Sequence, residues 1–224
     1  MCGLEMFEGL IRKNYEYKVA TIGMGEQDDK ELRVLGRAIT IEEHGVLYEP
    51  DQRHVETVIR DLELIKANPV LTPCEKPKYD KNEAKLVRDH RLGIQARVNP
   101  DTVVDDLDTR HSKLYQSLSA RLNYLAMDRP DLQFSVKELM RKMSRPDMDD
   151  FKALKRVARY ILGTPRVVQK FAWQRRPKEL STYVDSDFAG CRRTRKSTSG
   201  GAIIVGKHWI RTWSSTQKTI SLSS

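Results

Sequence analysis

The spacing of apolar residues changes period along this chain, and that change limits the fold more than any other feature. Between residues 112 and 163, apolar side chains recur at every third or fourth position, which is typical of amphipathic helices. After Trp173 the period falls to two, so that Tyr183 and Asp185 would lie on one face of a strand and Val184 on the other. The pattern predicts an α+β protein whose C-terminal part begins as an antiparallel meander.

A strand and its hairpin partner are expected before the helices. The segment "LRVLGRAITI", residues 32–41, predicts a strand, and "GVLYEP" predicts its partner across a short turn. Gly36 interrupts the first strand, where it marks either a bulge or the close approach of another backbone. Asp51 then suits the N-cap of a helix over residues 51–65. The apolar stripe of that helix is Val55, Val58, Ile59, Leu62 and Ile65.

Helical spacing returns after a long connection. Residues 67–111 carry many charges and little periodicity, and we expect one short helix within them, around residues 81–90. Residues 111–127 then predict a helix. The next helix begins with Pro130 and Asp131, which favour a first helical turn.

The last helix and the last hairpin have clear boundaries in the sequence. Asp149 and Asp150 are expected to cap the helix, and Gly163 to end it. Its apolar stripe is Phe151, Leu154, Ala158, Ile161 and Leu162. Further on, "GGAIIVG" and "HWIRTWS" predict a hairpin across Gly206 and Lys207.

Charge is distributed unevenly along the chain, whose formal net charge is +9. Residues 1–150 hold 24 basic and 28 acidic side chains, whereas residues 151–224 hold 16 basic and 3 acidic ones. The excess of basic side chains in residues 151–224 either forms a surface that contacts nucleic-acid phosphates or serves only for solubility. The predicted phosphate contacts are Lys152, Lys155, Arg156 and Arg159 on the last helix, and Arg192, Arg193, Arg195 and Lys196 in the basic run after it.

The cysteines and the hydropathy exclude several classes of protein. Cys2, Cys74 and Cys191 are scattered without a C-x-x-C spacing, which argues against a disulfide framework and a zinc site. No apolar run reaches membrane-spanning length, and the first residues lack the pattern of a signal peptide. We expect an intracellular protein, cytoplasmic or nuclear, with no membrane partner.

Motifs along the chain resemble those of one known family. The stretch "YVDSDFAGCRRTRKSTSGGAIIVG", followed by "WSSTQKTISLSS", resembles the start of the ribonuclease H domain in copia-type LTR retrotransposon Pol polyproteins. The earlier "LYQSLSARLNYLAMDRPDLQ" and "FKALKRVARYILGT" are similar to the helical end of that family's reverse transcriptase. "RVLGRAIT" and "GVLYEPDQRHVETVIRDL" are similar to its hairpin and first thumb helix, and Gly36 would lie at the hairpin that holds a primer end. Asp128, Ile161 and Gly201 depart from the usual pattern without breaking it.

The resemblance implies RNA-directed DNA synthesis and degradation of the RNA strand, both dependent on Mg²⁺. It assigns Asp185 as a catalytic carboxylate and metal ligand, with Asp187 as a neighbour. The Tyr-x-Asp-Asp turn of the polymerase centre does not occur in the chain, and the next carboxylate of the nuclease would follow Ser224. Because a two-ion centre needs several carboxylates, we expect weak or absent Mg²⁺ binding and leave open whether this chain is an enzyme.

The same resemblance divides the chain into four parts. These are a thumb-like hairpin and helix (1–66), a connecting segment (67–111), a helical connection (112–165) and a truncated ribonuclease H-like sheet (166–224). The expected partners are an RNA–DNA hybrid or another nucleic-acid duplex, and the remainder of the polyprotein. The chain would be inactive alone and would bind nucleic acid through its basic C-terminal third. The alternative is a non-catalytic remnant that binds nucleic acid or another protein.

Overall fold

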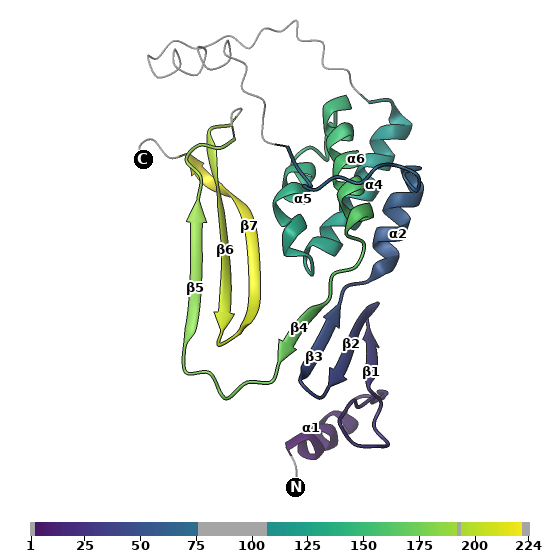
Figure 1. Ribbon diagram of the computed structural model, residues 1–224, viewed down its shortest axis with the longest axis vertical. Coiled ribbons are helices and arrows are strands. Elements are labelled where there is room, and N and C mark those ends of the chain that lie inside the picture. The colour runs from purple at the N-terminus through teal and green to yellow at the C-terminus, as the bar shows by residue number, and fades with distance from the viewer. Residues whose placement is uncertain (1–2, 76–106, 192–193, 221–224) are drawn as a thin grey trace, which may run out of the picture.

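The computed structural model describes residues 3–75, 107–191 and 194–220, and it confirms the α+β class (Figure 1). A four-stranded sheet lies below a group of helices, and a three-stranded sheet stands beside them. The predicted short helix around residues 81–90 lies outside the described residues. In the described part, no helix is long and apolar enough to cross a membrane.

The first sheet contains one strand more than the sequence predicts at its start. The prediction of a single strand over residues 32–41 is wrong, because Leu35 and Gly36 form a two-residue turn with φ angles of 51° and 82°. Positive φ at both positions is what tight hairpins require, and glycine adopts it without steric cost. A Cβ on Gly36 would lie 2.1 Å from Asp51 Oδ2, so the close approach at this glycine is to a side chain. The resulting antiparallel strands are β1 (Glu31–Val34), β2 (Arg37–Glu42) and β3 (Gly45–Glu49).

The fourth strand of this sheet comes from much later in the chain. Strand β4 (Gln169–Ala172) pairs antiparallel with β3, with Val46 opposite Phe171. The sheet therefore extends into the segment that the sequence assigns to the C-terminal module, and the boundary at residue 165 remains a prediction.

Four helices and a short 3-10 turn form the core of the molecule. Asp51 is the N-cap of the first of them, as predicted, and its carboxylate accepts the Arg53 N–H at 3.0 Å. That helix ends at Asp61 because Glu63 turns the chain with a φ of 57°, and Ile65 is consequently 69% exposed, outside the predicted stripe. The elements are α2 (Gln52–Asp61), α4 (Thr109–Ala126), η1 (Pro130–Leu132), α5 (Gln133–Met140) and α6 (Met148–Gly163). The separate helix α1 (Gly3–Arg12) lies at the N-terminal end.

The start of α6 differs from the prediction. Its N-cap is Asp147, which forms a reciprocal capping box with Asp150, whereas Asp149 lies in the first turn and pairs with Lys152. Most of the predicted apolar stripe is buried, although Leu162 is only half-buried. The fully buried core includes Val58, Tyr115, Leu118, Leu122, Leu132, Val136, Leu154, Val157 and Ile161.

A polar cluster joins the first sheet to the helices. Asp128, which is 9% exposed, accepts hydrogen bonds from Arg37 Nε and from the Tyr48 hydroxyl, both at 2.7 Å. Its backbone carbonyl also accepts the Gln169 side-chain amide at 2.6 Å. Strands β2, β3 and β4 thus all bind the turn that follows α4.

The C-terminal sheet is an antiparallel meander in the order β5–β6–β7, as the sequence predicts. Gly206 has a φ of 62°, which allows the predicted tight turn between β6 and β7. Helix α5 contacts this sheet through Gln133, whose amide donates to the Thr212 carbonyl at 3.3 Å, and through Lys137, which donates to the Thr198 hydroxyl at 2.7 Å. The strands are β5 (Leu180–Ser186), β6 (Lys196–Val205) and β7 (His208–Ile220).

Candidate nucleic-acid interface

Asp185 lies on β5, opposite Gly200 on β6. Thr198, two residues before Gly200, accepts a hydrogen bond from Lys137 of α5 and therefore faces the helices. Positions two apart on a strand share a face, and so do directly paired positions on neighbouring strands. Asp185 therefore also projects from the helical side of the sheet. Its side chain is exposed, and one oxygen accepts the N–H of Ser186 at 2.8 Å. The predicted position on a strand is therefore confirmed, while its role as a ligand stays a prediction.

Asp187 has a structural role in the loop that follows β5. Its Oδ1 accepts the Thr198 N–H at 2.7 Å and the Gly190 N–H at 3.3 Å. A Cβ at Gly190 would lie 2.2 Å from the other oxygen of the same carboxylate. The Asp187 carboxylate therefore links Gly190 to Thr198. Much of the capacity of this carboxylate to bind an ion is already used.

The described residues do not fit a two-ion magnesium centre. Among them, no three His, Cys, Asp or Glu side chains gather closely enough to hold a metal ion. Asp185 supplies one carboxylate, whereas Mg²⁺ requires near-octahedral oxygen ligation and catalysis at paired ions requires bridging carboxylates. The chain therefore offers a single candidate ligand on this strand.

Two of the predicted phosphate contacts lie where the β5–β6 loop meets β6: Arg195 ends the loop and Lys196 begins the strand. Arg195 and Lys196 are half-buried, and within the described part of the chain neither side chain has a salt bridge. The backbone of Arg195 has a φ of 57°, and its N–H donates to the Cys191 carbonyl at 2.7 Å. Two cations are thus placed at the N-terminal end of β6. Arg192 and Arg193 lie outside the described residues.

Cys191 anchors this loop to α5. The guanidinium of Arg141 lies 2.9 Å from the sulfur and also pairs with Glu138. Burial opposes ionisation of the thiol, but hydrogen bonds from Thr194 and Arg141 outweigh it and lower the pKa of Cys191 to about 7. The sequence identifies the cysteine but not its partner, because Arg141 lies 50 residues away in the chain.

The basic face of α6 is partly occupied by the preceding segment of the chain. Arg156 pairs with Glu75 and donates to the Thr72 hydroxyl at 3.1 Å, while Arg159 donates to the Asn68 carbonyl at 2.6 Å. The other two predicted contacts are also engaged locally: Lys152 pairs with Asp149, and the Lys155 ammonium lies 5.2 Å from the centre of the Phe151 ring. Arg156 and Arg159 thus hold residues 68–75, whereas Lys152 and Lys155 remain exposed.

The sequence reasoning missed a third group of cations. Arg175, Arg176 and Lys178 lie in the connection between β4 and β5, and all three are exposed. Lys207, in the turn between β6 and β7, is exposed as well. The signal was present as "RRPK", but a short basic run in a connection is more often only a solvated surface.

Similarity to known proteins identifies the family. Over 110 residues the chain is 38% identical to the retrovirus-related Pol polyprotein from transposon RE2 of Arabidopsis thaliana, covering 49% of this chain and 8% of that protein. It is 25% identical over 219 residues to the Pol polyprotein from transposon TNT 1-94 of Nicotiana tabacum, covering 97% of this chain and 15% of that protein. The chain belongs to the copia-type retrotransposon Pol family.

An uncharacterized mitochondrial protein of Arabidopsis thaliana is also similar, at 35% identity over 111 residues, which cover 49% of this chain and 45% of that protein. The chain thus spans less than half the length of each of these three relatives. No family model matches it, and no solved structure does.

Two signature segments of this copia-type chain meet in the core. Arg129, from "DRPD", is 1% exposed and donates to the Thr164 carbonyl at 3.0 Å. The Asp131 carboxylate accepts hydrogen bonds from Arg129 and, at 3.0 Å, from the Tyr160 hydroxyl. Tyr160 and Thr164 both belong to "RYILGT", so the two signatures are joined by hydrogen bonds around the buried Arg129 side chain.

Proposed function

We propose that the chain binds nucleic-acid duplexes, such as an RNA–DNA hybrid, as part of the reverse transcriptase and ribonuclease H region of a Pol polyprotein. The observation that carries this proposal is the pair of cations where the β5–β6 loop meets β6. Arg195 and Lys196 lie without salt bridges in the described structure, at the end of the strand that pairs with the one bearing Asp185. Around them the C-terminal third carries 16 basic and 3 acidic side chains.

Contacts from arginine and lysine to phosphate oxygens would give binding without base-sequence preference. Arg195 and Lys196 are suited to this because the Arg195 N–H donates to the Cys191 carbonyl and the Thr198 N–H donates to Asp187, so their backbone loses little conformational entropy when a phosphate is bound. In the whole polyprotein, the proposed activity is RNA-directed DNA synthesis together with cleavage of the RNA strand. In that setting Asp185 would be one ligand of Mg²⁺, and the β1–β2 hairpin around Gly36 would hold the primer end. The proposed compartment is the cytoplasm or the nucleus.

Fluorescence anisotropy with a labelled RNA–DNA hybrid tests the proposal. The double variant Arg195→Ala/Lys196→Ala is compared with Arg110→Ala/Lys113→Ala, which removes the same charge from exposed positions on α4. We expect the loop variant to bind several-fold more weakly and the α4 variant to bind like the unmodified chain. Equal affinities for the two variants would contradict the proposal, and so would failure of the unmodified chain to bind.

The four cations of α6 are expected to contribute less. Arg156 and Arg159 would have to leave residues 68–75 before they could contact a phosphate. The variant Lys155→Ala, which leaves those contacts intact, is expected to lower hybrid affinity less than the loop variant in the same titration. A larger loss for Lys155→Ala would assign the interface to α6 instead.

A further inference from the structure

The β4–β5 connection and the β6–β7 turn are held together at one end of the C-terminal sheet. Both polar atoms of the Gln174 side chain bind the β6–β7 turn. Gln174 Nε2 donates to the Val205 carbonyl at 3.1 Å, and Gln174 Oε1 accepts the Lys207 N–H at 2.8 Å. His208 completes the contact, because its Nε2 lies 2.7 Å from the Ala172 carbonyl. Two segments more than 30 residues apart are thus fixed side by side.

Gly206 allows this contact. Its φ is 62°, and a Cβ at this position would lie 2.4 Å from Gln174 Oε1. Any other residue would therefore strain the turn and displace the amide that binds it. The arrangement is a built feature of the fold and not a chance contact between two loops.

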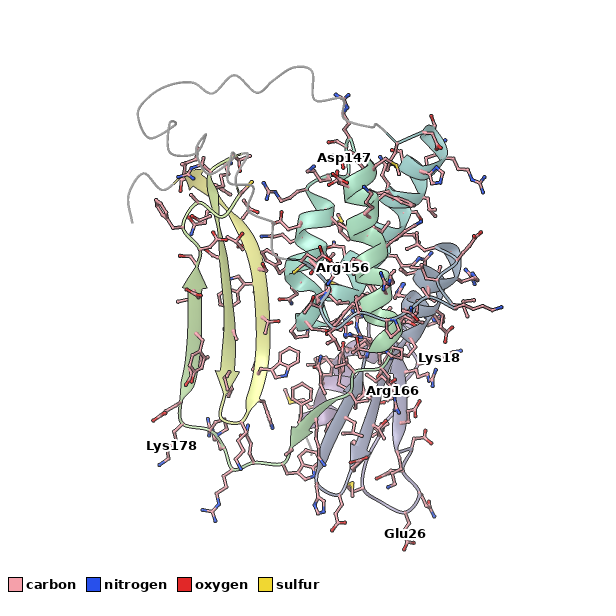
Figure 2. The ribbon with its side chains drawn as sticks, turned by 45° about the horizontal axis from the view of Figure 1, so that its top comes forward. Lys18, Glu26, Asp147, Arg156, Arg166 and Lys178 are labelled. Carbon is pink, nitrogen blue, oxygen red and sulfur yellow. The ribbon has the colours of Figure 1, made fainter. Side chains whose placement is uncertain are left out.

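The contact of Gln174 and His208 between the β4–β5 connection and the β6–β7 turn, here called the clamp, brings four cations and an exposed indole to the same end of the sheet. Arg175, Arg176 and Lys178 follow Gln174 directly in the chain, and Lys207 takes part in the clamp; Figure 2 shows Lys178 pointing away from the body of the molecule. Within the described residues, none of these four side chains has a salt bridge, and Glu179 is the one acidic residue of the connection. Trp173, immediately before Gln174, is 56% exposed.

We propose that this surface, formed by Trp173, Arg175, Arg176, Lys178 and Lys207, binds single-stranded nucleic acid. Cations that follow a backbone, combined with an aromatic ring on which a base can stack, form the usual combination for single strands. A duplex offers phosphates but keeps its bases stacked inside, so an exposed indole adds nothing to duplex binding. The surface lies at the end of β6 opposite to Arg195 and Lys196, and it adds a second nucleic-acid form to the proposed duplex binding.

The backbone of the connection supports the stacking role of the indole. The Trp173 N–H donates to the His44 carbonyl at 3.1 Å, which fixes the chain just before the basic run. The other two tryptophans, Trp209 and Trp213, are half-buried in β7, and Trp209 packs on Phe171 with ring centroids 6.4 Å apart. Of the three tryptophans, Trp173 is therefore the one placed to meet a base.

Two titrations of the whole chain test the proposal, one with a labelled oligo-dT strand and one with a labelled RNA–DNA hybrid. We expect Arg175→Ser/Arg176→Ser/Lys178→Ser to weaken oligo-dT binding by about tenfold or more while hybrid affinity changes by less than about twofold. The loop variant Arg195→Ala/Lys196→Ala should show the reverse pattern. Gln174→Ala keeps every charge but releases the clamp, so it should also weaken oligo-dT binding selectively.

Tryptophan fluorescence gives a second readout that a purely structural role of Trp173 would not change. Oligo-dT is expected to quench the emission of the unmodified chain, and Trp173→Phe should remove most of that quenching while the far-UV circular dichroism stays the same. Absence of oligo-dT binding, or equal binding by the triple variant, overturns this inference even where hybrid binding persists. Failure to bind hybrid with normal oligo-dT binding contradicts the duplex proposal alone, and failure to bind either overturns both.

Discussion

Arg129 and Thr164 lie 35 residues apart in the sequence, yet the Arg129 guanidinium donates to the Thr164 carbonyl at 3.0 Å inside the core. The same guanidinium pairs with Asp131 at 2.7 Å, so it joins the turn before α5 to the end of α6. Burying a guanidinium that is 1% exposed is costly unless it is hydrogen-bonded, and Arg129 has one acceptor in the Thr164 carbonyl and another in the Asp131 carboxylate.

Replacing Arg129 by Met should therefore destabilise the protein strongly. The substitution keeps the volume roughly but removes the Arg129 hydrogen bonds to the Thr164 carbonyl and to the Asp131 carboxylate, which keeps the Tyr160 hydroxyl as a donor. We expect the free energy of unfolding to fall by about 2–4 kcal/mol, since breaking a buried pair typically costs 3–5 kcal/mol and Asp131 keeps some solvent contact. Urea denaturation measures the change. Arg110→Met, on the exposed face of α4, is the control and should shift stability by less than about 0.5 kcal/mol.

The Asp131 carboxylate makes stability depend on pH. Burial alone would raise its pKa, but the hydrogen bond and charge of Arg129 and the Tyr160 hydroxyl outweigh burial and hold the pKa below its usual value. A carboxyl with a lowered pKa in the folded state stabilises the protein above the unfolded pKa, about 3.9, and this stabilisation is lost as pH falls through the folded value. Thermal melts between about pH 6 and 3 should show this loss. Asp131→Asn should be less stable at pH 6 and show a shallower decline; an unchanged decline would contradict this origin.

The Leu35–Gly36 turn offers a pair of substitutions with opposite expected effects. Leu35 is 76% exposed and has a positive φ, which asparagine adopts more readily than leucine, so Leu35→Asn should raise the stability by a few tenths to about 1 kcal/mol. Gly36→Ala places a Cβ against Asp51 and strains the backbone, so it should lower stability by about 1–3 kcal/mol. Chemical denaturation of both variants checks the turn. Similar stabilities would favour the single strand that the sequence pattern indicates.

The thiol of Cys191 should react as a partly ionised group near neutral pH. In a Cys2→Ser/Cys74→Ser chain it is the remaining cysteine, so the rate of alkylation by iodoacetamide reports its thiolate directly. We expect the rate to rise with a midpoint near pH 7, in line with the lowered pKa of about 7. Arg141→Gln removes a hydrogen bond and a positive charge, so its midpoint should move toward the ordinary cysteine value of about 8.5. An unchanged midpoint would show that Arg141 does not set the pKa.

The periodic elements could be predicted from the sequence, and the contacts between distant segments could not. Asp51 and the Gly206 turn are local signals, so the start of α2 and the last hairpin were found. Val46 and Phe171 pair although the whole helical region separates them in the sequence, so their pairing depends on how the helices pack. Strand β4 has only four residues, which is too short for a recognisable alternating pattern.

The candidate interface was predicted in part, for a similar reason. Arg156 lies on a correctly predicted helical face, but its partner Glu75 comes from a segment without periodicity, so the sequence could not show that this cation is occupied. Asp128, a departure from the family pattern, proved to join β2 and β3 to the helices. Its two partners lie 91 and 80 residues away, beyond the reach of any local pattern.

The salt dependence of hybrid binding tests the central proposal most directly. Anisotropy titrations of the unmodified chain with two RNA–DNA hybrids of unrelated sequence, across a series of salt concentrations, give the slope of log affinity against log salt. We predict equal affinities for the two hybrids, a steep negative slope, and a slope shallower by about 2 for Arg195→Ala/Lys196→Ala. A salt-independent affinity, a strong preference for one hybrid, or an unchanged slope in that variant would contradict phosphate binding by the β5–β6 loop.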